Sequence, residues 1–169
     1  YFGKGRKWGV KIEYITQRKQ QGTAHAVQSV EGMVGDAFLV LNGDVMVTAD
    51  NIIGLQQKPP PAMGIIELKE VGGAGVVVLD GDRVIRILEK VKDPPSHLVN
   101  TGVYFFDRRI FDAINQTGKS PRGEYEITES LQRIIDSGIP LSHERLGHWM
   151  DVSYPWDLLA ANDRSLQEI

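Results

Sequence analysis

The chain has 169 residues, of which 41% are hydrophobic and 24% charged, and this length and composition are typical of one folded domain. They exclude a disordered, collagen-like or coiled-coil protein, and the lack of cysteine excludes disulfide scaffolds, thiolate nucleophiles and cysteine zinc sites. No apolar run approaches the ~18 residues that a membrane helix needs, and the net charge of -3 is unlike that of a basic, non-specific nucleic-acid binder. We therefore expect a soluble, cytoplasmic protein with no nucleic-acid or membrane partner.

The first half of the chain predicts a strand, a helix and a second strand. Short apolar runs rich in β-formers predict strands at residues 12–15 and 38–42, and apolar residues at helical spacing between Ala24 and Val34 predict the helix. Such a unit generally joins parallel strands through a right-handed crossover. Next come a short helix over 52–58, the prolines 59–61 that end it, and a strand over 63–68.

The second half contains an antiparallel element. Apolar runs at 75–79 and 83–89 flank Asp80-Gly81, which is a strong signal for a two-residue hairpin turn. The later elements are a strand over 98–106, a helix from Asp107 to about 114, a helix over 124–137 before Gly138, a strand over 141–146 and a helix from about Pro155. The expected fold is α/β, a single domain with a mixed, mostly parallel sheet and an inserted antiparallel hairpin.

Two acidic residues follow predicted strands. Asp44 comes directly after a buried strand, and in open α/β sheets ligands bind beyond the carboxyl ends of the strands. Asn42-Gly43 is equally a hairpin signal, and the local sequence favours that turn. Asp151 is a second acid near a strand end. Together the two carboxylates suit Mg²⁺, which takes one or two protein carboxylates plus substrate phosphates.

Two polar segments are further candidates for binding. Gln17 and Gly22-Thr23 lead into a helix whose free N–H groups could hold a nucleobase or an anion, although a plain helix start with Thr23 as N-cap is favoured locally. Glu89-Lys90 and Asn100-Thr101-Gly102 could hydrogen-bond sugar hydroxyls. For Glu89-Lys90 an exposed, solvated strand end is favoured when the pair is considered alone, and for Asn100-Thr101-Gly102 the alternative is a plain strand entry.

The order of these segments resembles the sugar-1-phosphate nucleotidyltransferases. The similarity covers nearly the whole chain, and within the family it looks closest to the glucose-1-phosphate thymidylyltransferases and the archaeal-type bifunctional uridylyltransferases. The matching segments are Gln17, Gly22 to Ala26, Leu41 to Asp44, Glu89-Lys90, Asn100 to Tyr104, Gly123 to Thr128, Trp149 to Val152 and Tyr154 to Leu159.

The resemblance implies a Rossmann-like nucleotidyltransferase fold and a transfer reaction. A sugar 1-phosphate, with glucose 1-phosphate expected, would attack the α-phosphorus of dTTP or UTP, and pyrophosphate would leave. Asp44 and Asp151 match the family's metal-binding aspartates, so the implied cofactor is Mg²⁺ and the two acids are the implied catalytic residues. Gln17 and Gly22 match positions that contact the nucleobase, with Thr23 beside them.

The resemblance also implies a sugar site. Its predicted contacts are Gly75, Glu89, Lys90 and Asn100, and Thr101 and Gly102 would form the floor beneath the sugar. No covalent nucleophile is needed, because the sugar phosphate supplies its own attacking oxygen.

The chain departs from the family pattern in several places. No stretch matches the family's first strand and its glycine-rich, arginine-containing phosphate loop, so we expect an N-terminally incomplete domain over 1–169 that turns over weakly or not at all. A sheet that lacks an inner strand exposes main-chain N–H and C=O groups, and we therefore expect a homo-oligomer. Val91 and Ser153 replace a common proline and glycine, and within these residues we expect no left-handed β-helix like that of bifunctional relatives.

One functional alternative belongs to a different class. A nucleotidyltransferase-like chain could bind sugar phosphates as a non-catalytic or regulatory module. The absent phosphate loop favours this alternative, and the two retained aspartates favour the enzyme.

Overall fold

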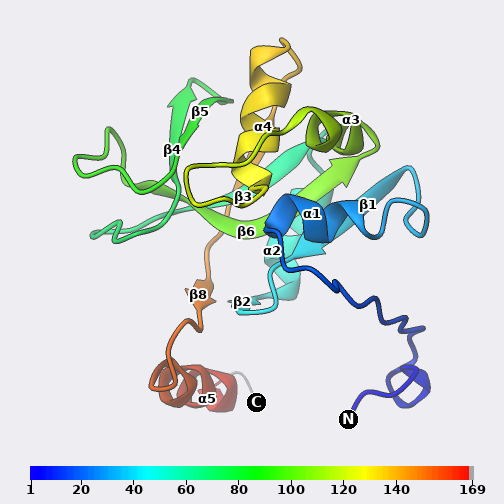
Figure 1. Cartoon of the computed structure of the whole chain (residues 1–169). Coiled ribbons are helices and arrows are strands. Elements are labelled where there is room, and N and C mark those ends of the chain that lie inside the picture. The colour runs from blue at the N-terminus through cyan, green and yellow to red at the C-terminus, as the bar shows by residue number, and fades with distance from the viewer. Residues whose placement is uncertain (168–169) are drawn as a thin grey trace.

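The chain folds around a mixed six-stranded sheet, and the computed structural model describes residues 1–167 (Figure 1). The strands lie in the order β5, β4, β6, β3, β7, and β1 pairs with the end of β6. The strands of the sheet are β1 (Ala37–Leu41), β3 (Ala62–Glu67), β4 (Val76–Asp80), β5 (Arg83–Leu88), β6 (Leu98–Asp107) and β7 (Ser142–Arg145). A separate two-stranded ribbon contains β2 (Val45–Val47) and β8 (Trp149–Asp151). The predicted α/β fold class with a mixed sheet is confirmed.

The prediction that the sheet is mostly parallel is wrong. β6 pairs with β1, β3 and β4, and it is antiparallel to each of them. Among the described strands, β3 and β7 are the pair that runs parallel. The inserted hairpin explains the difference, because its turn reverses the chain and β6 then runs through the middle of the sheet in the reversed direction. A parallel neighbour would have needed a further crossover.

Helices cover both faces of the sheet. α1 (Thr23–Gln28), α3 (Arg109–Gln116) and α4 (Ile127–Asp136) pack on one face, and α2 (Ala49–Gln56) packs on the other (Figure 1). Side chains alternate along a strand, so β6 supplies both cores. Tyr104 and Phe106 belong to the first core, whereas Val103 and Phe105 belong to the second.

Most of the other predicted elements are present, with shifted ends. The hairpin turn lies one residue later than predicted, because Asp80 still pairs with Arg83 and Gly81 takes the positive φ of 56°. Ser137 is the C-cap of α4, and Gly138 follows it with a φ of 82°, so the glycine predicted as the C-cap lies one position beyond it, where a left-handed glycine commonly ends a helix. α1 ends at Gln28, and residues 29–34 form turns, so the helix predicted up to Val34 is shorter.

Residues 12–15, predicted as the first strand, form no strand. The N–H of Ile12 donates to the carbonyl of Lys4, and the Tyr14 hydroxyl donates to the carbonyl of Gly3. These bonds tie the segment to the chain around the short 3-10 helix η1 (Arg6–Trp8). A strand is stable only beside a partner, and no strand within residues 1–167 runs beside this segment. The predicted pair of parallel strands is therefore not formed.

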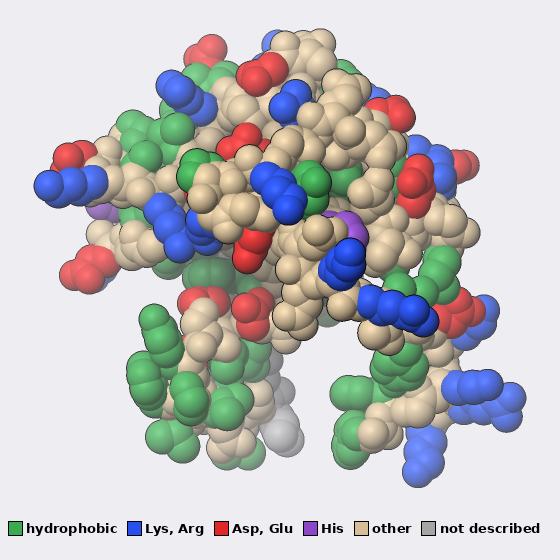
Figure 2. Space-filling model, viewed as in Figure 1, with side chains coloured by type: hydrophobic (Ala, Val, Ile, Leu, Met, Phe, Trp, Pro, Cys, Tyr) green, Lys and Arg blue, Asp and Glu red, His purple; other side chains and the backbone are tan. Residues whose placement is uncertain are grey.

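The last helix, α5 (Asp157–Gln167), lies away from the sheet (Figure 1). Hydrophobic side chains gather over it on the face seen in Figure 2, and Leu158 and Leu159 are among those exposed. Over residues 1–167, no helix is both long and apolar enough to cross a membrane.

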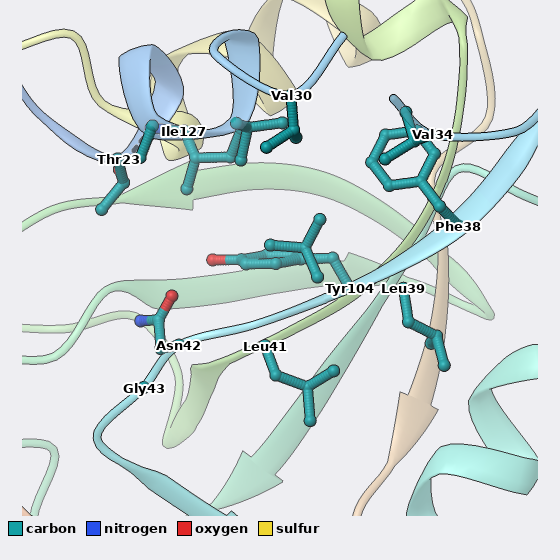
Figure 3. A pocket seen from close by; sticks show the side chains of 13 residues that line it. Thr23, Val30, Val34, Phe38, Leu39, Leu41, Asn42, Gly43, Tyr104 and Ile127 are labelled. Atoms are coloured by element: carbon teal, nitrogen blue, oxygen red, sulfur yellow. Dashed lines mark hydrogen bonds between the residues drawn. The ribbon is translucent and has the colours of Figure 1, made fainter. Parts of the chain in front are cut away.

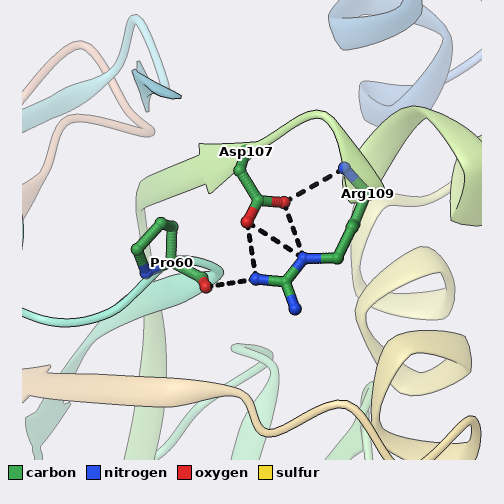
Figure 4. Close-up of polar contacts among 3 residues, drawn as sticks. All are labelled: Pro60, Asp107 and Arg109. Carbon is green, nitrogen blue, oxygen red and sulfur yellow. Dashed lines mark hydrogen bonds and ion pairs between the residues drawn. The ribbon is translucent and has the colours of Figure 1, made fainter. Parts of the chain in front are cut away.

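An ion pair joins the end of β6 to the start of α3. Both Asp107 carboxylate oxygens accept from the Arg109 guanidinium, and Arg109 also donates to the carbonyl of Pro60 (Figure 4). Burial raises the pKa of the Asp107 carboxyl, but the hydrogen bonds from Arg109 lower it more, so the net pKa is below the ordinary value. The bonds hold the turn between β6 and α3 against the central sheet.

Candidate active site

The β2–β8 ribbon brings the main chains of the two predicted metal-binding acids together. Asp151 lies opposite Val45 in the ribbon, and the N–H of Val152 donates to the carbonyl of Asp44 at 2.7 Å. Asp44 and Asp151 are therefore within one residue of each other along the ribbon, although 107 positions (151 − 44) separate them in the sequence. Both residues are exposed.

The hairpin that the local sequence favoured at Asn42-Gly43 is not formed. β1 pairs with β6, whereas β2 pairs with β8, so the two strands around this turn belong to different sheets. Asp44 therefore lies at the point where the chain leaves the sheet. The physical reason is that the partner strands come from distant parts of the chain, which the local turn signal does not report.

Two hydrogen bonds hold the ribbon and its acid. The Trp149 indole N–H donates to the carbonyl of Thr101 at 2.8 Å, which ties β8 to β6. The Ser153 hydroxyl donates to the Asp151 carboxylate at 2.9 Å, so the serine found in place of glycine binds this acid directly. The Thr101 side chain is buried and donates to the carbonyl of Gly64 at 2.8 Å, which links β8, β6 and β3 at one point.

Three of the predicted sugar-binding residues lie side by side. The N–H of Asn100 donates to the carbonyl of Gly75 at 2.8 Å. A Cβ added at Gly75 would lie 2.9 Å from the Glu89 carboxylate and 3.7 Å from the Cβ of Asn100, so this position accepts only glycine without movement of its neighbours. The neighbouring Lys90 is exposed and takes a left-handed backbone with a φ of 48°.

Gly102 lies against the loop that carries Asp44. It has a φ of 73°, and its carbonyl accepts from the N–H of Asn42 at 2.9 Å. A Cβ at this position would lie 2.5 Å from the Asn42 amide nitrogen. Positive φ and lack of space both require glycine here. The floor predicted beneath the sugar is thus in contact with the segment that leads to Asp44, one of the two acids predicted to bind the metal.

The predicted nucleobase contacts gather at the start of α1. The Gln17 amide nitrogen lies 3.2 Å from the carbonyl of Gly22 and 2.7 Å from Nδ1 of His25. Gly22 is the N-cap with a φ of 109°, and a Cβ there would lie 2.4 Å from the carbonyl oxygen of Tyr125. The plain helix start with Thr23 as its N-cap is therefore wrong, because Gly22 takes that position. The Thr23 hydroxyl instead accepts from the N–H of Ile127 at 2.9 Å and so caps the start of α4.

A groove of about 420 Å³ lies beside these groups, with Thr23, Asn42 and Gly43 in its lining (Figure 3). It runs between α1 and β1 and is mostly apolar, with Val30, Val34 and Phe38 among its lining residues. Thr23, Asn42 and the Tyr104 hydroxyl lie near one another at its polar end (Figure 3). Thr23, predicted beside the nucleobase, therefore borders the same groove as the loop that leads to Asp44, and the Tyr104 hydroxyl in this groove accepts from Asn100 of the predicted sugar site.

Three residues of this region had no role predicted from the sequence. Asn42, Tyr104 and Trp149 stand inside the matching segments, yet their partners are Gly102, Asn100 and Thr101, which only the folded chain reveals. The sequence signals that could have pointed to these three residues are an asparagine directly before Gly43 and aromatic residues next to the polar motifs.

The fold and this clustering define an α/β nucleotide-binding domain of the nucleotidyltransferase class. Residues 1–168 match the family described as Nucleotidyl transferase. The chain therefore belongs to the nucleotidyl transferase family.

Individual relatives agree with this assignment. The chain is 39% identical over 164 residues to the bifunctional protein GlmU of Methanococcus maripaludis, and the match covers 94% of this chain and 39% of that protein. It is 34% identical over 168 residues to the UTP–glucose-1-phosphate uridylyltransferase AglF of Haloferax volcanii, covering 95% of this chain and 69% of AglF. The chain thus spans about two fifths of the length of the GlmU relative.

Solved structures share the fold. A crystal structure of a Bacillus anthracis protein assigned as a glucose-1-phosphate thymidylyltransferase, with sucrose bound, superposes with a TM-score of 0.82 at 29% identity. The superposition covers 96% of this chain and 68% of that one.

Proposed function

We propose that this chain is the catalytic domain, or most of it, of a Mg²⁺-dependent sugar-1-phosphate nucleotidyltransferase. It would transfer a nucleotidyl group from dTTP or UTP to a sugar 1-phosphate, with glucose 1-phosphate as the first substrate to test. The products are a nucleotide sugar and pyrophosphate. The observation that carries this proposal is the ribbon contact that brings Asp44 and Asp151 together next to the Asn100-Thr101-Gly102 segment.

The donor groups fit the proposed metal. Asp44 and Asp151 offer exposed carboxylate oxygens, which are the ligands that Mg²⁺ prefers. Residues 1–167 contain no group of three or more acidic, histidine or cysteine side chains that could hold an ion by themselves. Two protein carboxylates plus substrate phosphates would complete such a site. Bound there, Mg²⁺ would neutralise phosphate charge and favour an in-line arrangement of the attacking and leaving oxygens.

The chain's own residues would bind and orient the substrates. Glu89 and Asn100 would hydrogen-bond sugar hydroxyls, and the missing side chain at Gly75 leaves room beside them. Gln17 and the backbone at Gly22 would contact the base. A sugar-phosphate oxygen then forms a bond to the α-phosphorus, and the bond from this phosphorus to the bridging oxygen of the leaving pyrophosphate breaks. Catalysis would come from positioning and charge stabilisation, without a covalent intermediate on the protein.

Binding is the direct test, because no segment of residues 1–169 resembles the family's phosphate loop and we expect weak or no turnover from this chain alone. Calorimetric titrations would use UDP-glucose and dTDP-glucose with and without Mg²⁺. The wild-type chain should bind at least one of them more tightly with Mg²⁺. Asp44→Ala and Asp151→Ala should each remove that enhancement, whereas Asp36→Ala, an exposed acid before β1, should keep it.

Two outcomes would count against the proposal. Wild-type chain that binds neither nucleotide sugar would refute the function, and Mg²⁺ enhancement that survives in both aspartate variants would refute the metal assignment. Binding without pyrophosphate release is expected of this chain under both hypotheses, so the feature that separates the enzyme from the non-catalytic alternative is Mg²⁺-enhanced binding that is lost in Asp44→Ala and Asp151→Ala.

A further inference from the structure

The Asn100 side chain is held by two neighbours on its own strand. Its amide nitrogen donates to the Tyr104 hydroxyl at 2.7 Å, and its amide oxygen accepts from the N–H of Gly102 at 3.2 Å. A primary amide has two N–H donors and an oxygen with two lone pairs. One donor and one acceptor site of Asn100 therefore remain for a ligand, in an orientation that the two neighbours set.

A bulge in β6 makes the contact between residues 100 and 104 possible. Met63 pairs with Tyr104 and Ile65 pairs with Asn100, so β3 advances by two residues where β6 advances by four. Gly102, with its φ of 73°, lies in the middle of the extra residues. In a regular strand, residues four apart are ~13 Å apart along the chain, too far for these two side chains to meet so closely. The bulge shortens this separation.

The Tyr104 hydroxyl is itself held firmly. Tyr104 is 2% exposed, and its ring stacks on Phe106 with ring centroids 5.0 Å apart. Burial raises the pKa of its hydroxyl, the hydrogen bond with Asn100 lowers it, and the Glu89 charge raises it, so the net pKa lies above the ordinary value. The hydroxyl is therefore protonated and neutral at physiological pH.

We propose that Tyr104 is a positioning residue for sugar recognition: its hydroxyl fixes the Asn100 amide in the orientation that hydrogen-bonds a hydroxyl of the sugar ring. This inference rests on the proposed function and deepens it. Tyr104 makes no contact with the sugar in this scheme, and it acts through Asn100. The aromatic ring alone would fill the core equally well, so the hydroxyl is the group that has to be tested.

The first experiment separates sugar recognition from nucleotide recognition. The affinities for UDP-glucose or dTDP-glucose, whichever the wild-type chain binds, and for the matching free nucleotide would be measured for Tyr104→Phe. The variant should lose roughly 3- to 10-fold in affinity for the nucleotide sugar, the size expected for one hydrogen bond, and keep its affinity for the free nucleotide. Tyr14→Phe, which removes a hydroxyl from an exposed tyrosine, is the matched control and should bind like the wild type.

A double-mutant cycle tests whether Tyr104 acts through Asn100. Asn100→Ala should weaken nucleotide-sugar binding at least as much as Tyr104→Phe, and the double variant should bind like Asn100→Ala alone. Additive losses would overturn the proposal, and so would an unchanged nucleotide-sugar affinity or an equal loss for the free nucleotide in Tyr104→Phe.

A second measurement does not use Tyr104→Phe. Nucleotide sugars that lack single ring hydroxyls would be titrated into the wild-type chain and into Asn100→Ala. One deoxy sugar should weaken binding to the wild type and have no further effect on the variant. If no deoxy sugar behaves in this way, Asn100 binds no sugar hydroxyl, and the role of Tyr104 is refuted while the proposed function stands. If the wild-type chain binds no nucleotide sugar at all, both the proposed function and the role of Tyr104 are refuted.

Discussion

Glu126 is a buried acid whose partner comes from the loop before it. Its carboxylate accepts two hydrogen bonds from Arg122, at 3.0 Å and 2.7 Å, and the glutamate is the N-cap residue of α4. The pKa of the Glu126 carboxyl lies below its ordinary value, mainly because of the hydrogen bond from Arg122. Burial raises this pKa, whereas the hydrogen bond from Ser120 and the charges of Arg122 and Lys90 lower it further.

This lowered pKa predicts an acid-sensitive contribution to stability. Because the pKa is lower in the folded than in the unfolded chain, the stabilisation is complete above the unfolded-state value and is lost as the pH falls through the folded-state value. Glu126→Gln should lower the free energy of unfolding by about 1 kcal/mol at pH 7. As the pH falls, the variant should lose less of its free energy of unfolding than the wild type. Urea unfolding at several pH values between neutral and strongly acidic would measure this free energy for both proteins.

The exposed Glu70 supplies the control for this prediction. Glu70→Gln should keep the wild-type dependence of stability on pH. A Glu126→Gln variant whose stability falls with acid as steeply as that of the wild type would contradict the assignment.

At the level of elements, the β2–β8 ribbon depends on its attachment to the sheet. Each of its strands has three residues, so its own ladder is short, and a ribbon of this size is marginal by itself. Trp149 attaches it, by packing in the second core and by donating its indole N–H to Thr101. The ribbon positions both acids, so its attachment should matter for metal binding.

Trp149→Phe tests this attachment, because phenylalanine keeps an aromatic ring and removes the N–H donor. The Mg²⁺ concentration needed to enhance nucleotide-sugar binding should rise by about tenfold, as is common when a group that supports a metal ligand is lost. Binding without Mg²⁺ should change less. A Mg²⁺ titration followed by calorimetry would measure both values.

Trp156→Phe is the matched control, since Trp156 is 65% exposed and its ring stacks on Tyr154. It should need the same Mg²⁺ concentration as the wild-type chain. If Trp149→Phe and Trp156→Phe behave alike, the indole hydrogen bond does not position the acids.

On the scale of the whole molecule, β1 has an open edge. It pairs with β6 on one side, and no strand of the described chain pairs with it on the other. The apolar groove runs along this strand, and Leu41 within its lining is 42% exposed. Unpaired main-chain groups beside apolar surface favour pairing with another chain.

We therefore expect two copies of this chain to associate through β1. Light scattering after size exclusion should show a mass that rises from monomer to dimer with concentration. Leu41→Lys should shift the population to monomer, because a charge on an open strand edge opposes pairing. Ile53→Lys, at an exposed position of α2, should not. A wild-type chain that stays monomeric at every concentration would contradict this prediction.

Much of the fold follows from local spacing. Asp107 before α3, the apolar periodicity of α4, the β-rich runs and Gly138 placed these elements close to their observed ends, because each signal depends on neighbours along the chain. The order of the motifs was enough to predict the family. The same sequence also predicted a strand at 12–15 that the structure lacks, because a strand forms only when another strand supplies its hydrogen-bond partners.

The residues of the candidate site could be named from the sequence, but the contacts among them could not. Asp44, Asp151, Glu89 and Asn100 were named from the sequence as site residues, and the fold places the first two on one ribbon and the last two beside Gly75. The role of Thr23 as a cap for α4 was not predicted. Its partner, Ile127, lies 104 positions away in the sequence, so no local pattern could reveal the bond.

The sequence by itself determined which residues are candidates for each role: two carboxylates for a proposed metal, polar groups for a proposed sugar and base, and apolar runs for the sheet and helices. Only the tertiary structure decided the direction of β6 and the bulge that lets Asn100 bond to Tyr104. It also decided the hydrogen bond from Trp149 to Thr101 that attaches the β2–β8 ribbon to the sheet. The physical reason is that composition and spacing act along the chain, whereas strand pairing and side-chain hydrogen bonds join residues that only folding brings within reach.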